Sequence, residues 1–306
     1  MNPGGKTIII GARASRLAVI QAEKVRKLLE KAHPHLNFEL IEITTSGDRD
    51  RHTPLAQMGG VGVFVKEMEY ALKDGGIDMA VHSAKDLPST LTEGFIIGAV
   101  PERGAVEDCL VCKGNWKLNA IPISSIIATS SPRRRALVKW FRPDLELCDV
   151  RGNVETRLRK LKEGEFDGII LARAGLKRLG MERVINEILD PLEFLPAPGQ
   201  GAIAVEVRAG DDFTLDIAAA VDDPQINACL QAERGFLRRL GAGCASAVGG
   251  YCRLEGRKLM ITAGMLDLSG KKFLKTEGEC DIGDGAERLG EAAAEALIRQ
   301  ETRIAN

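Results

Sequence analysis

The stretch "KTIIIGARASRLAVIQAEKVRKLLEKA" (residues 6–32) predicts the kind of fold that this chain adopts. Its first apolar run has the length of a buried strand, and Ser15 follows where the N-cap of a helix belongs. After Ser15, apolar residues such as Leu17, Val25 and Leu29 recur close to one helical face. A strand followed directly by a helix is the repeating unit of parallel sheets with covering helices.

The same alternation continues along most of the chain. Further apolar runs with the character of strands occupy residues 38–43, 78–83, 95–100, 125–131, 145–150 and 167–172. Helical patterns separate several of them, which favours an α/β fold with mainly parallel sheets. From Pro224 onward the pattern changes to a helix, three meandering strands and a last helix at about 285–299, which predicts a small α+β C-terminal domain.

The composition of the 306 residues restricts the class of protein. Hydrophobic residues make up 44% of the chain, enough for packed cores, and the formal net charge of -1 argues against a general nucleic-acid binder. The first residues contain no apolar run as long as a signal sequence or a membrane span. We therefore expect a cytoplasmic protein without nucleic-acid or membrane partners, whose seven scattered cysteines are reduced.

The richest basic segment is "ATSSPRRR" (residues 128–135), at the end of a predicted strand. Ser131 would end the strand, and Pro132 suits the first turn of the helix that follows. Free backbone N–H groups, two hydroxyls and adjacent arginines at a helix start form an anion site. The alternative is that these arginines are only solvated, and we expect at least Arg135 to point away from any site.

Two more strand–helix junctions carry the same residue types. Arg151 and Arg157 lie around a Gly-Asn turn, and Arg13 and Ser15 follow the first strand. Ligands of open parallel sheets bind at the carboxyl ends of the strands, so three such junctions indicate a polyanionic ligand. The chain has neither a GxxxxGK[ST] loop nor a GxGxxG turn after a strand, so we expect carboxylates rather than a nucleotide.

The stretch "VHSAKDLPS" (residues 81–89) places Ser83, Lys85 and Asp86 just beyond another strand end. A carboxylate there would oppose anion binding. A functional Asp86 would therefore have to face a cationic intermediate or a donor N–H. The alternative is that Asp86 is only a turn residue before Leu-Pro.

The cysteines and the four histidines do not suggest a metal site. Cys109 and Cys112 match CxxC but fall on a predicted strand, where residues three apart point to opposite faces, and no second pair follows at zinc spacing. Cys244 differs, because it lies in the open stretch "GAGCASAVGG" (residues 241–250) with no base nearby. It is either a small residue in a tight loop or an attachment point that needs room.

Taken in order, these stretches resemble the porphobilinogen deaminase family, also called the hydroxymethylbilane synthases. The resemblance covers nearly the whole chain. Each motif alone is modest, but eight in the expected order are specific. The motifs are "GARASRLAVIQ" (11–21), "GGVGVFVKEME" (59–69), "VHSAKDLP" (81–88), "ATSSPRRR" (128–135), "VRGNVETRL" (150–158), "ILARAGLKRLG" (170–180), "PAPGQGA" (196–202) and "GAGC" (241–244).

The resemblance implies a transferase of tetrapyrrole and heme biosynthesis. Such an enzyme joins four porphobilinogen molecules head to tail, releases ammonia at each step and gives hydroxymethylbilane. It also implies a dipyrromethane cofactor, made from the substrate and held by a thioether on Cys244. Asp86 is implied as the catalytic carboxylate, which would bind pyrrole N–H groups and stabilise the positive charge that forms as ammonia leaves.

The resemblance further implies binding residues and domains. The acetate and propionate arms of each pyrrole would account for the number of arginines. The implied fold has two domains like periplasmic binding proteins, formed by residues 1–101 with 202–219 and by 106–195, and a third domain, 224–306, that carries the cysteine. The implied cofactor contacts are Ser83, Lys85, Thr129, Ser131, Arg133, Arg134 and Arg157, and the implied substrate contacts are Arg13, Ser15, Arg151, Arg178 and Gln200.

The chain departs from the family's usual pattern at a few positions. Segment 44–62 is polar, long and rich in glycine, and we interpret it as a lid. Lysines are usual in the family where this segment has Gln57 and Val61, and leucine is usual at Pro132. A Gln-Val-Pro-like run is usual where this chain has Ala245, Ser246 and Ala247. The arginine set is intact, so the expectation of activity stands.

From the residues alone, two other classes stay open. One is a binding protein that closes on a carboxylate ligand without chemistry, although Cys244 on an added third domain argues against it. The other is a transferase with a cysteine nucleophile, which would need a base near Cys244. Our expectation is a monomeric enzyme that acts on porphobilinogen and holds no metal.

Overall fold

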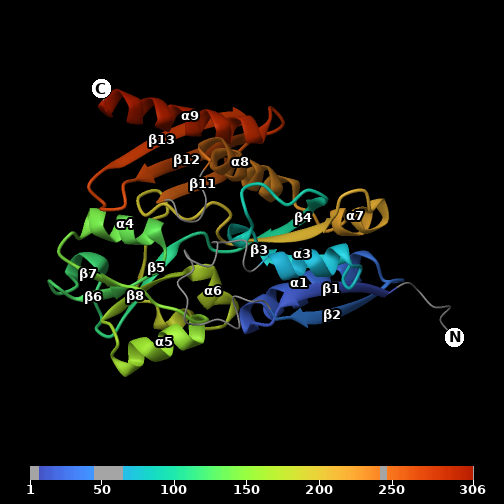
Figure 1. Cartoon of the computed structure of the whole chain (residues 1–306), viewed down its shortest axis with the longest axis horizontal. Helices are drawn as coiled ribbons and strands as arrows, with labels where there is room; N and C mark the ends of the chain where they lie inside the picture. The colour runs from blue at the N-terminus through green and yellow to red at the C-terminus, as the bar shows by residue number, and fades with distance from the viewer. Residues whose placement is uncertain (1–6, 45–64, 242–246, 306) are drawn as a thin grey trace. The chain divides into compact units, whose positions relative to one another are not determined.

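The computed structural model describes residues 7–44, 65–241 and 247–305. The chain divides into two compact units (Figure 1). The first comprises Met1–Gly104 and Ala202–Asn227, and the second comprises Ala105–Gly201 and Ala228–Asn306. Cys244 and most of the predicted lid, 44–62, lie outside the described residues.

The first unit is built on a five-stranded sheet. Its strands are β1 (Thr7–Arg13), β2 (Asn37–Ile43), β3 (Met79–Ser83), β4 (Phe95–Arg103) and β10 (Ala202–Arg208). The order in the sheet is β2-β1-β3-β10-β4, with β1 parallel to β2 and β3, and β10 antiparallel to β3 and β4. The carboxyl ends of β1 and β3 are therefore neighbours at one edge of the sheet.

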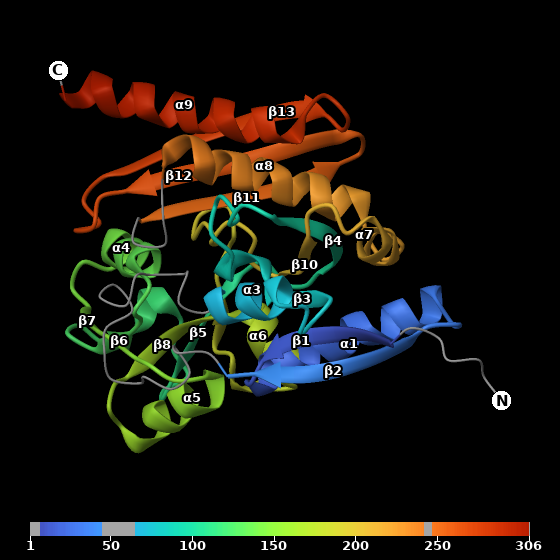
Figure 2. The ribbon, with the colours of Figure 1, turned by 45° about the vertical axis from the view of Figure 1, so that its right-hand side comes forward.

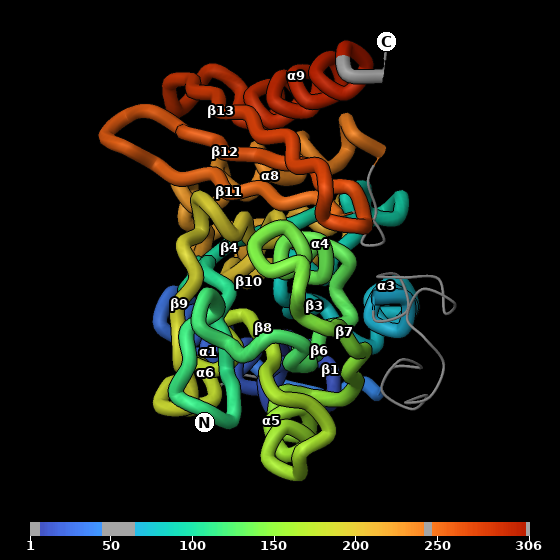
Figure 3. The backbone as a smooth tube through the Cα atoms, turned by 90° about the vertical axis from the view of Figure 1, so that its left-hand side faces the viewer, coloured from blue at the N-terminus to red at the C-terminus, as the bar shows by residue number. Residues whose placement is uncertain are grey.

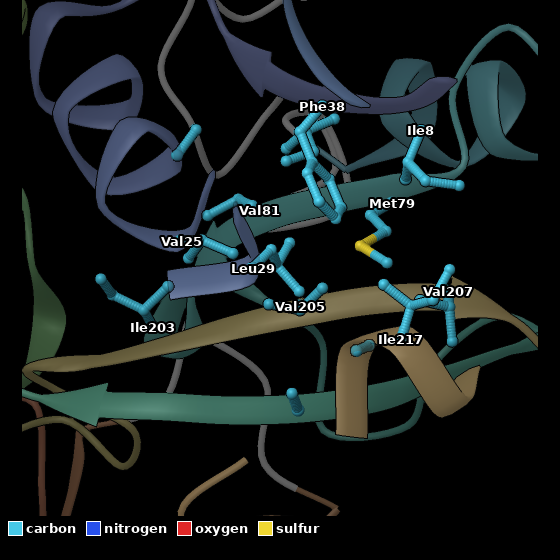
Figure 4. Close-up of a cluster of buried hydrophobic side chains, with 14 of the residues drawn as sticks. Ile8, Val25, Leu29, Phe38, Met79, Val81, Ile203, Val205, Val207 and Ile217 are labelled. Carbon is cyan, nitrogen blue, oxygen red and sulfur yellow. The ribbon is translucent and has the colours of Figure 1, made fainter. Parts of the chain in front are cut away.

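Helices cover both faces of this sheet, because alternate strand residues point to opposite sides. The helices are α1 (Arg16–Ala32), α3 (Lys66–Lys73) and α7 (Asp212–Ala219). Ile8 and Met79 pack with Leu29 of α1 in the larger of the two cores (Figure 4). On the opposite face, Ala80 packs with Met68 of α3.

The second unit contains another five-stranded sheet. Its strands are β5 (Asp108–Cys112), β6 (Ile126–Ala128), β7 (Glu146–Cys148), β8 (Gly168–Ala172) and β9 (Glu187–Ile188). The order is β7-β6-β8-β5-β9, with β6 parallel to β7 and β8, and β5 antiparallel to β8 and β9. Asp108, the first residue of β5, is paired with Ala172, the last residue of β8. Asp108 therefore lies at the edge where the parallel strands end.

The helices α4 (Pro132–Phe141) and α5 (Val154–Glu163) lie on opposite sides of this second sheet (Figure 3). Leu137 of α4 packs in one core and Leu161 of α5 in the other. Cys109 belongs to the core under α5, whereas Cys112 packs against the core under α4. This confirms that the CxxC pair lies on a strand and points to opposite faces, as the sequence predicted.

The C-terminal part of the second unit is a three-stranded antiparallel sheet covered by two helices (Figure 2). Its elements are α8 (Pro224–Leu240), β11 (Val248–Glu255), β12 (Lys258–Leu266), β13 (Phe273–Asp281) and α9 (Ala286–Ala305). The two helices approach closely at Gly290, where an added Cβ atom would lie 1.8 Å from the carbonyl oxygen of Ala232. Glycine is required there because any side chain would separate the helices.

Short helices complete the described chain. They are the 3₁₀ helices η2 (Ala84–Asp86), η3 (Leu118–Ala120) and η4 (Glu182–Val184), and the α-helix α6 (Arg173–Arg178). The predicted α/β fold class is confirmed, as is the helix that begins at Pro224, and a strand lies in each of the expected apolar runs. Two strands are shorter than predicted, because β6 ends at Ala128 and β7 at Cys148, so Ser131 does not end the strand but caps α4. The sequence analysis missed β10 as a strand that completes the first sheet.

Candidate functional site

A small pocket of about 60 Å³ lies at the carboxyl ends of β1 and β3 in the first unit. Arg13 ends β1, Ser83 ends β3, and Asp86 ends the 3₁₀ turn directly after it. The parallel pairing of the two strands brings these residues to the same edge. The pocket is lined by Arg13, Ser15, Leu17, Ala18, Gln21, Val65, Val81, His82, Ser83 and Asp86. Four of the predicted site residues thus share one pocket.

Two hydroxyls of this pocket have defined hydrogen bonds. Ser15 is the N-cap of α1, as predicted, and its Oγ accepts from the backbone N–H of Ala18 at 3.3 Å. Ser83 Oγ lies 3.0 Å from Nε2 and 3.2 Å from Oε1 of Gln21, so it can accept from one atom and donate to the other. Gln21 is almost fully buried on α1 and thereby fixes the position of Ser83.

Lys85 and Asp86 are both partly exposed in the turn that follows Ser83. The turn is short because the backbone N–H of Leu87 returns to the carbonyl of Ala84 at 3.2 Å. Leu87 itself is buried and anchors the end of the turn. The Asp86 carboxylate therefore stands at the pocket on a fixed backbone, while part of it remains open to solvent.

Buried charges lie behind this pocket, on the sheet face that α3 covers. His82 Nε2 is 2.9 Å from Oε2 of Glu206, and both side chains are buried. Burial raises the pKa of Glu69 on α3, the charge of Glu206 raises it further, and the hydroxyl of Thr92, which donates to Glu69 at 2.8 Å, opposes that shift. The sequence analysis did not single out these residues. One signal was available, since Glu206 is the only charged residue inside the apolar run "AIAVEV" (residues 202–207).

In the second unit, Arg133 and Arg134 converge on one buried carboxylate. Arg133 Nη1 donates to Oδ2 of Asp108 at 2.7 Å, and Arg134 donates to Oδ1 from Nη2 at 2.7 Å and from Nε at 3.1 Å. Asp108 is 0% exposed, and the two arginines are 4% and 8% exposed. Burial opposes ionisation of Asp108, but the two guanidinium groups outweigh it and hold the pKa of its carboxyl well below its usual range.

The sequence predicted these arginines as anion ligands but did not identify Asp108, which lies 25 residues before Arg133. Two cations around one carboxylate leave a net positive charge at the strand ends. Backbone oxygens accept as well, with Arg133 Nη1 at 2.6 Å from the Leu195 carbonyl and Arg134 Nη1 at 3.1 Å from that of Ile170. Arg135 is partly exposed and its Nη1 lies 3.3 Å from both the Thr129 carbonyl and Asp149.

The segment between β6 and α4 has the geometry of a helix start. Ser131 is the N-cap of α4, and its Oγ accepts from the backbone N–H of Arg134 at 3.4 Å. Pro132 occupies the first turn, as predicted. Thr129 is buried and its Oγ1 accepts from the backbone N–H of Ser131 at 3.2 Å. The two hydroxyls therefore shape the turn that presents the arginines.

Arg151 and Arg157 lie at the start of α5, in the same unit. Gly152 has a φ of 108°, a conformation that favours glycine, and Asn153 is the N-cap of the helix. Arg157 Nε donates to the Gly152 carbonyl at 2.8 Å. Arg151 is partly exposed. The Gly-Asn turn thus sets the direction in which α5 leaves the sheet and the place of both arginines.

Arg178 and Gln200 contact the segment that precedes β10. Arg178 Nη2 donates to the carbonyl of Gly201 at 2.7 Å, and burial lowers the pKa of Arg178 to about 10. Gln200 is 0% exposed, and its Nε2 donates to Asp108 Oδ1 at 3.0 Å and to the Val106 carbonyl at 2.7 Å. Gln200 therefore joins the group around Asp108, and Arg178 holds the neighbouring backbone.

Other kinds of site have less support within the described ranges. No group of three or more His, Cys, Asp or Glu among these residues is arranged to hold a metal ion. None of the helices in this part of the chain has the length and apolar character needed to cross a membrane. Burial raises the pKa of the Cys109 thiol to about 12, so this cysteine is not an activated nucleophile.

The fold and these residues define an α/β protein in which hydroxyl, carboxylate and guanidinium groups gather at the carboxyl ends of parallel strands in each unit. Comparison with protein families makes the class specific. Residues 8–216 match the family model for porphobilinogen deaminase, dipyromethane cofactor binding domain, and residues 227–299 match that for porphobilinogen deaminase, C-terminal domain. The chain belongs to the porphobilinogen deaminase family.

Porphobilinogen deaminases from other organisms are similar in sequence to this chain along almost its full length. The chain is 46% identical over 292 residues to porphobilinogen deaminase of Roseiflexus castenholzii, covering 95% of this chain and 96% of the relative. It is 44% identical over 295 residues to that of Syntrophomonas wolfei, covering 96% of each chain. Among solved structures, the methionine binding protein MetQ aligns with a TM-score of 0.46 and 12% identity, covering 70% of this chain and 89% of that protein.

Proposed function

We propose specific roles for the residues of this porphobilinogen deaminase. As a member of its family, the chain condenses porphobilinogen units head to tail with loss of ammonia, and it uses a dipyrromethane cofactor. The observation that carries our proposal is that Asp86 shares one strand-end pocket with Arg13, Ser15 and Ser83. A carboxylate that is surrounded by anion-binding groups suits a reaction in which a cation develops on a substrate that carries carboxylates.

Asp86 is the catalytic residue in this proposal. Its carboxylate binds pyrrole N–H groups and stabilises the positive charge that develops as the amino group leaves. Arg13 and Ser15, on the neighbouring strand end, bind carboxylate arms of the substrate. Ser83, which Gln21 orients, and Lys85 donate to the cofactor. Because Asp86 is partly exposed, it faces both the pocket and the solvent.

The residues of the second unit fit a group that carries several carboxylates. Dipyrromethane, when bound, supplies the primer to which substrate units are added. Arg133 and Arg134 hold its carboxylates through the net positive charge that one Asp108 leaves on two guanidinium groups. Thr129, Ser131 and Arg157 add further donors, and Arg151, Arg178 and Gln200 act on the substrate side.

Cys244 is the attachment point in this proposal. It lies outside the described residues, so its role rests on the motif "GAGC" and on membership of the family. The third domain that carries it, 224–306, and the boundaries of the other two, 1–101 with 202–219 and 106–195, are part of the same proposal. So are a monomeric state and a cytoplasmic location.

Substitution of Asp86 separates catalysis from simple carboxylate binding. Asp86→Asn keeps the size of the side chain but removes its charge, so bilane formation should fall about a hundredfold to a thousandfold. Asp86→Glu keeps the charge but displaces it, and its rate should lie between the two. The assay follows bilane formation by protein that intact mass shows to carry cofactor, since the same chemistry assembles the cofactor. Near-normal turnover of cofactor-loaded Asp86→Asn would leave Asp86 as a turn residue only.

A further inference from the structure

The segment "LPAPGQG" (residues 195–201) is here named the bridge. On one side it is hydrogen-bonded to Arg133 and to Asp108. The carbonyl of Leu195 accepts from Arg133 at 2.6 Å. Near the other end of the bridge, Gln200 donates to Asp108 at 3.0 Å. Both ends of the bridge are therefore hydrogen-bonded to Arg133 or Asp108, on which the proposed cofactor binding depends.

The same segment is bonded to α8 and β11 on its other side. The backbone N–H of Gly199 donates to Glu233 Oε2 of α8 at 2.6 Å. Glu233 Oε1 accepts from the backbone N–H of Cys252 in β11 at 2.7 Å. The N–H of Gly250, also in β11, donates to the Pro196 carbonyl at 3.0 Å. One carboxylate thus joins the bridge, the helix and the strand.

Gly249, at the start of β11, allows the bridge to come this close. A Cβ atom added to Gly249 would lie 2.6 Å from the Cβ of Leu195 and 3.0 Å from its carbonyl oxygen. One added to Gly250 would lie 3.4 Å from Pro198, which is ordinary contact. Position 249 is therefore where the strand and the bridge are in tightest contact, and a side chain there would push Leu195 away from β11.

Glu233 is suited to this place by having two acceptor oxygens. The side chain is 0% exposed, and each of its oxygens accepts from a different backbone N–H. Glutamine has the same shape but only one acceptor oxygen, and its NH₂ group would face a second donor. A buried donor left without an acceptor costs about 1–3 kcal/mol. Glu233→Gln is therefore an isosteric substitution that breaks one of these two hydrogen bonds.

We propose that Glu233 is a positioning residue for the condensation reaction. In the sequence, Cys244 stands between Leu240, the end of α8, and Val248, the start of β11. Glu233 bonds both elements to the bridge, and the bridge holds Arg133 and Asp108. The carboxylate therefore fixes the elements that flank the attachment point relative to the arginines. This inference rests on the proposed roles of Cys244 and Arg133.

The test compares Glu233→Gln with Leu297→Ala, a truncation in the core between α9 and the C-terminal sheet. Cofactor loading is read by intact mass, and kcat and KM are then measured on loaded protein. Displacement of an anchored chain by about 1 Å can cost on the order of a hundredfold in rate. Glu233→Gln should therefore lose tenfold to a hundredfold, mainly in kcat, or fail to load, while Leu297→Ala of similar thermal midpoint stays within about twofold of wild type.

A second pair of variants covers the case in which Glu233→Gln does not fold. Gly249→Ala pushes the bridge away without touching Glu233, and Gly278→Ala is a matched change in β13 where the nearest side-chain atom would be 3.2 Å away. Only Gly249→Ala should reduce kcat. Wild-type kcat in loaded Glu233→Gln or Gly249→Ala would overturn the proposal. A wild-type protein without cofactor mass would instead refute the role of Cys244, which keeps the two failures distinct.

Discussion

Arg134 donates two hydrogen bonds to a single oxygen of Asp108, from Nη2 at 2.7 Å and from Nε at 3.1 Å. Arg133 binds the second oxygen at 2.7 Å, so one buried carboxylate orients two guanidinium groups. Such a carboxylate determines where the arginines can present their remaining donors and how much positive charge they retain. The positions of both guanidinium groups therefore depend on Asp108, which the sequence did not point to.

Asp108→Asn should destabilise the protein by about 3–5 kcal/mol at neutral pH, because it leaves two buried cations without their counter-charge. The effect should depend on pH. The folded-state pKa of Asp108 is lowered, so its contribution is present above the unfolded pKa of about 3.9 and is lost as the pH falls below that value. Urea unfolding between pH 7 and pH 3 measures the free energy of unfolding of wild-type protein and of Asp108→Asn. A difference in stability that is constant over this range would contradict the ion-pair account.

Arg133→Lys and Arg134→Lys should each impair cofactor loading or change which enzyme-bound intermediates accumulate. Lysine keeps the charge but has a single donor nitrogen on a flexible stem, so it cannot reproduce the planar guanidinium group. In Arg134, Nε and Nη2 bind Asp108 while Nη1 binds the Ile170 carbonyl. Arg135→Lys is the matched control, because Arg135 is partly exposed and its side chain donates at 3.3 Å to the Thr129 carbonyl and to Asp149 rather than to Asp108. Native mass spectrometry after addition of porphobilinogen separates the intermediates. Wild-type patterns in both variants would remove these arginines from the cofactor site.

Glu69→Gln should make the protein more stable above neutral pH, with a gain of a few degrees in the thermal midpoint. Burial and the charge of Glu206 raise the pKa of Glu69, so the folded state favours the protonated form. The stability from that form is complete below the unfolded pKa and is lost as the pH rises through the folded pKa. Glutamine is neutral throughout and still offers an oxygen to Thr92. Melting curves should show a larger gain at pH 8 than at pH 5, and a loss of stability at pH 8 would contradict this prediction.

Cys109 should be the last of the described cysteines to react with a thiol reagent. Its side chain is 0% exposed and burial raises its pKa to about 12, so almost no thiolate forms at neutral pH. Peptide mapping after brief alkylation gives the order of reaction. Cys112, Cys148 and Cys280 are less buried and should be modified first. Early modification of Cys109 in folded protein would show that β5 opens more readily than its packing indicates.

The sequence predicted features that depend on neighbours along the chain. Ser15 caps α1 and Pro132 begins α4, because a cap and a first-turn proline act within one helical turn. Strand-end residues such as Ser83 and Asp86 were predicted to lie at a sheet edge because parallel strands end together. These local and topological rules were sufficient to indicate the pocket of the first unit.

Contacts between distant residues were not predictable in the same way. Asp108 is 25 residues from Arg133 and 92 from Gln200, and β5 must run antiparallel to β8 before its first residue reaches the strand ends. Glu206 meets His82 only because β10 inserts between β3 and β4. In both cases a charged residue in an apolar strand was the visible signal, but its partner is set by sheet order, which periodicity does not determine.

The mass of the intact purified protein tests the central claim most directly, namely that Cys244 carries a covalent dipyrromethane. Wild-type protein should be heavier than its sequence by two porphobilinogen units less two ammonias, and Cys244→Ser should have the mass of its sequence alone. After unfolding, six of the seven cysteines should then react with a thiol reagent in wild-type protein. A fully active wild-type protein with the unmodified mass and seven reactive thiols would contradict the account.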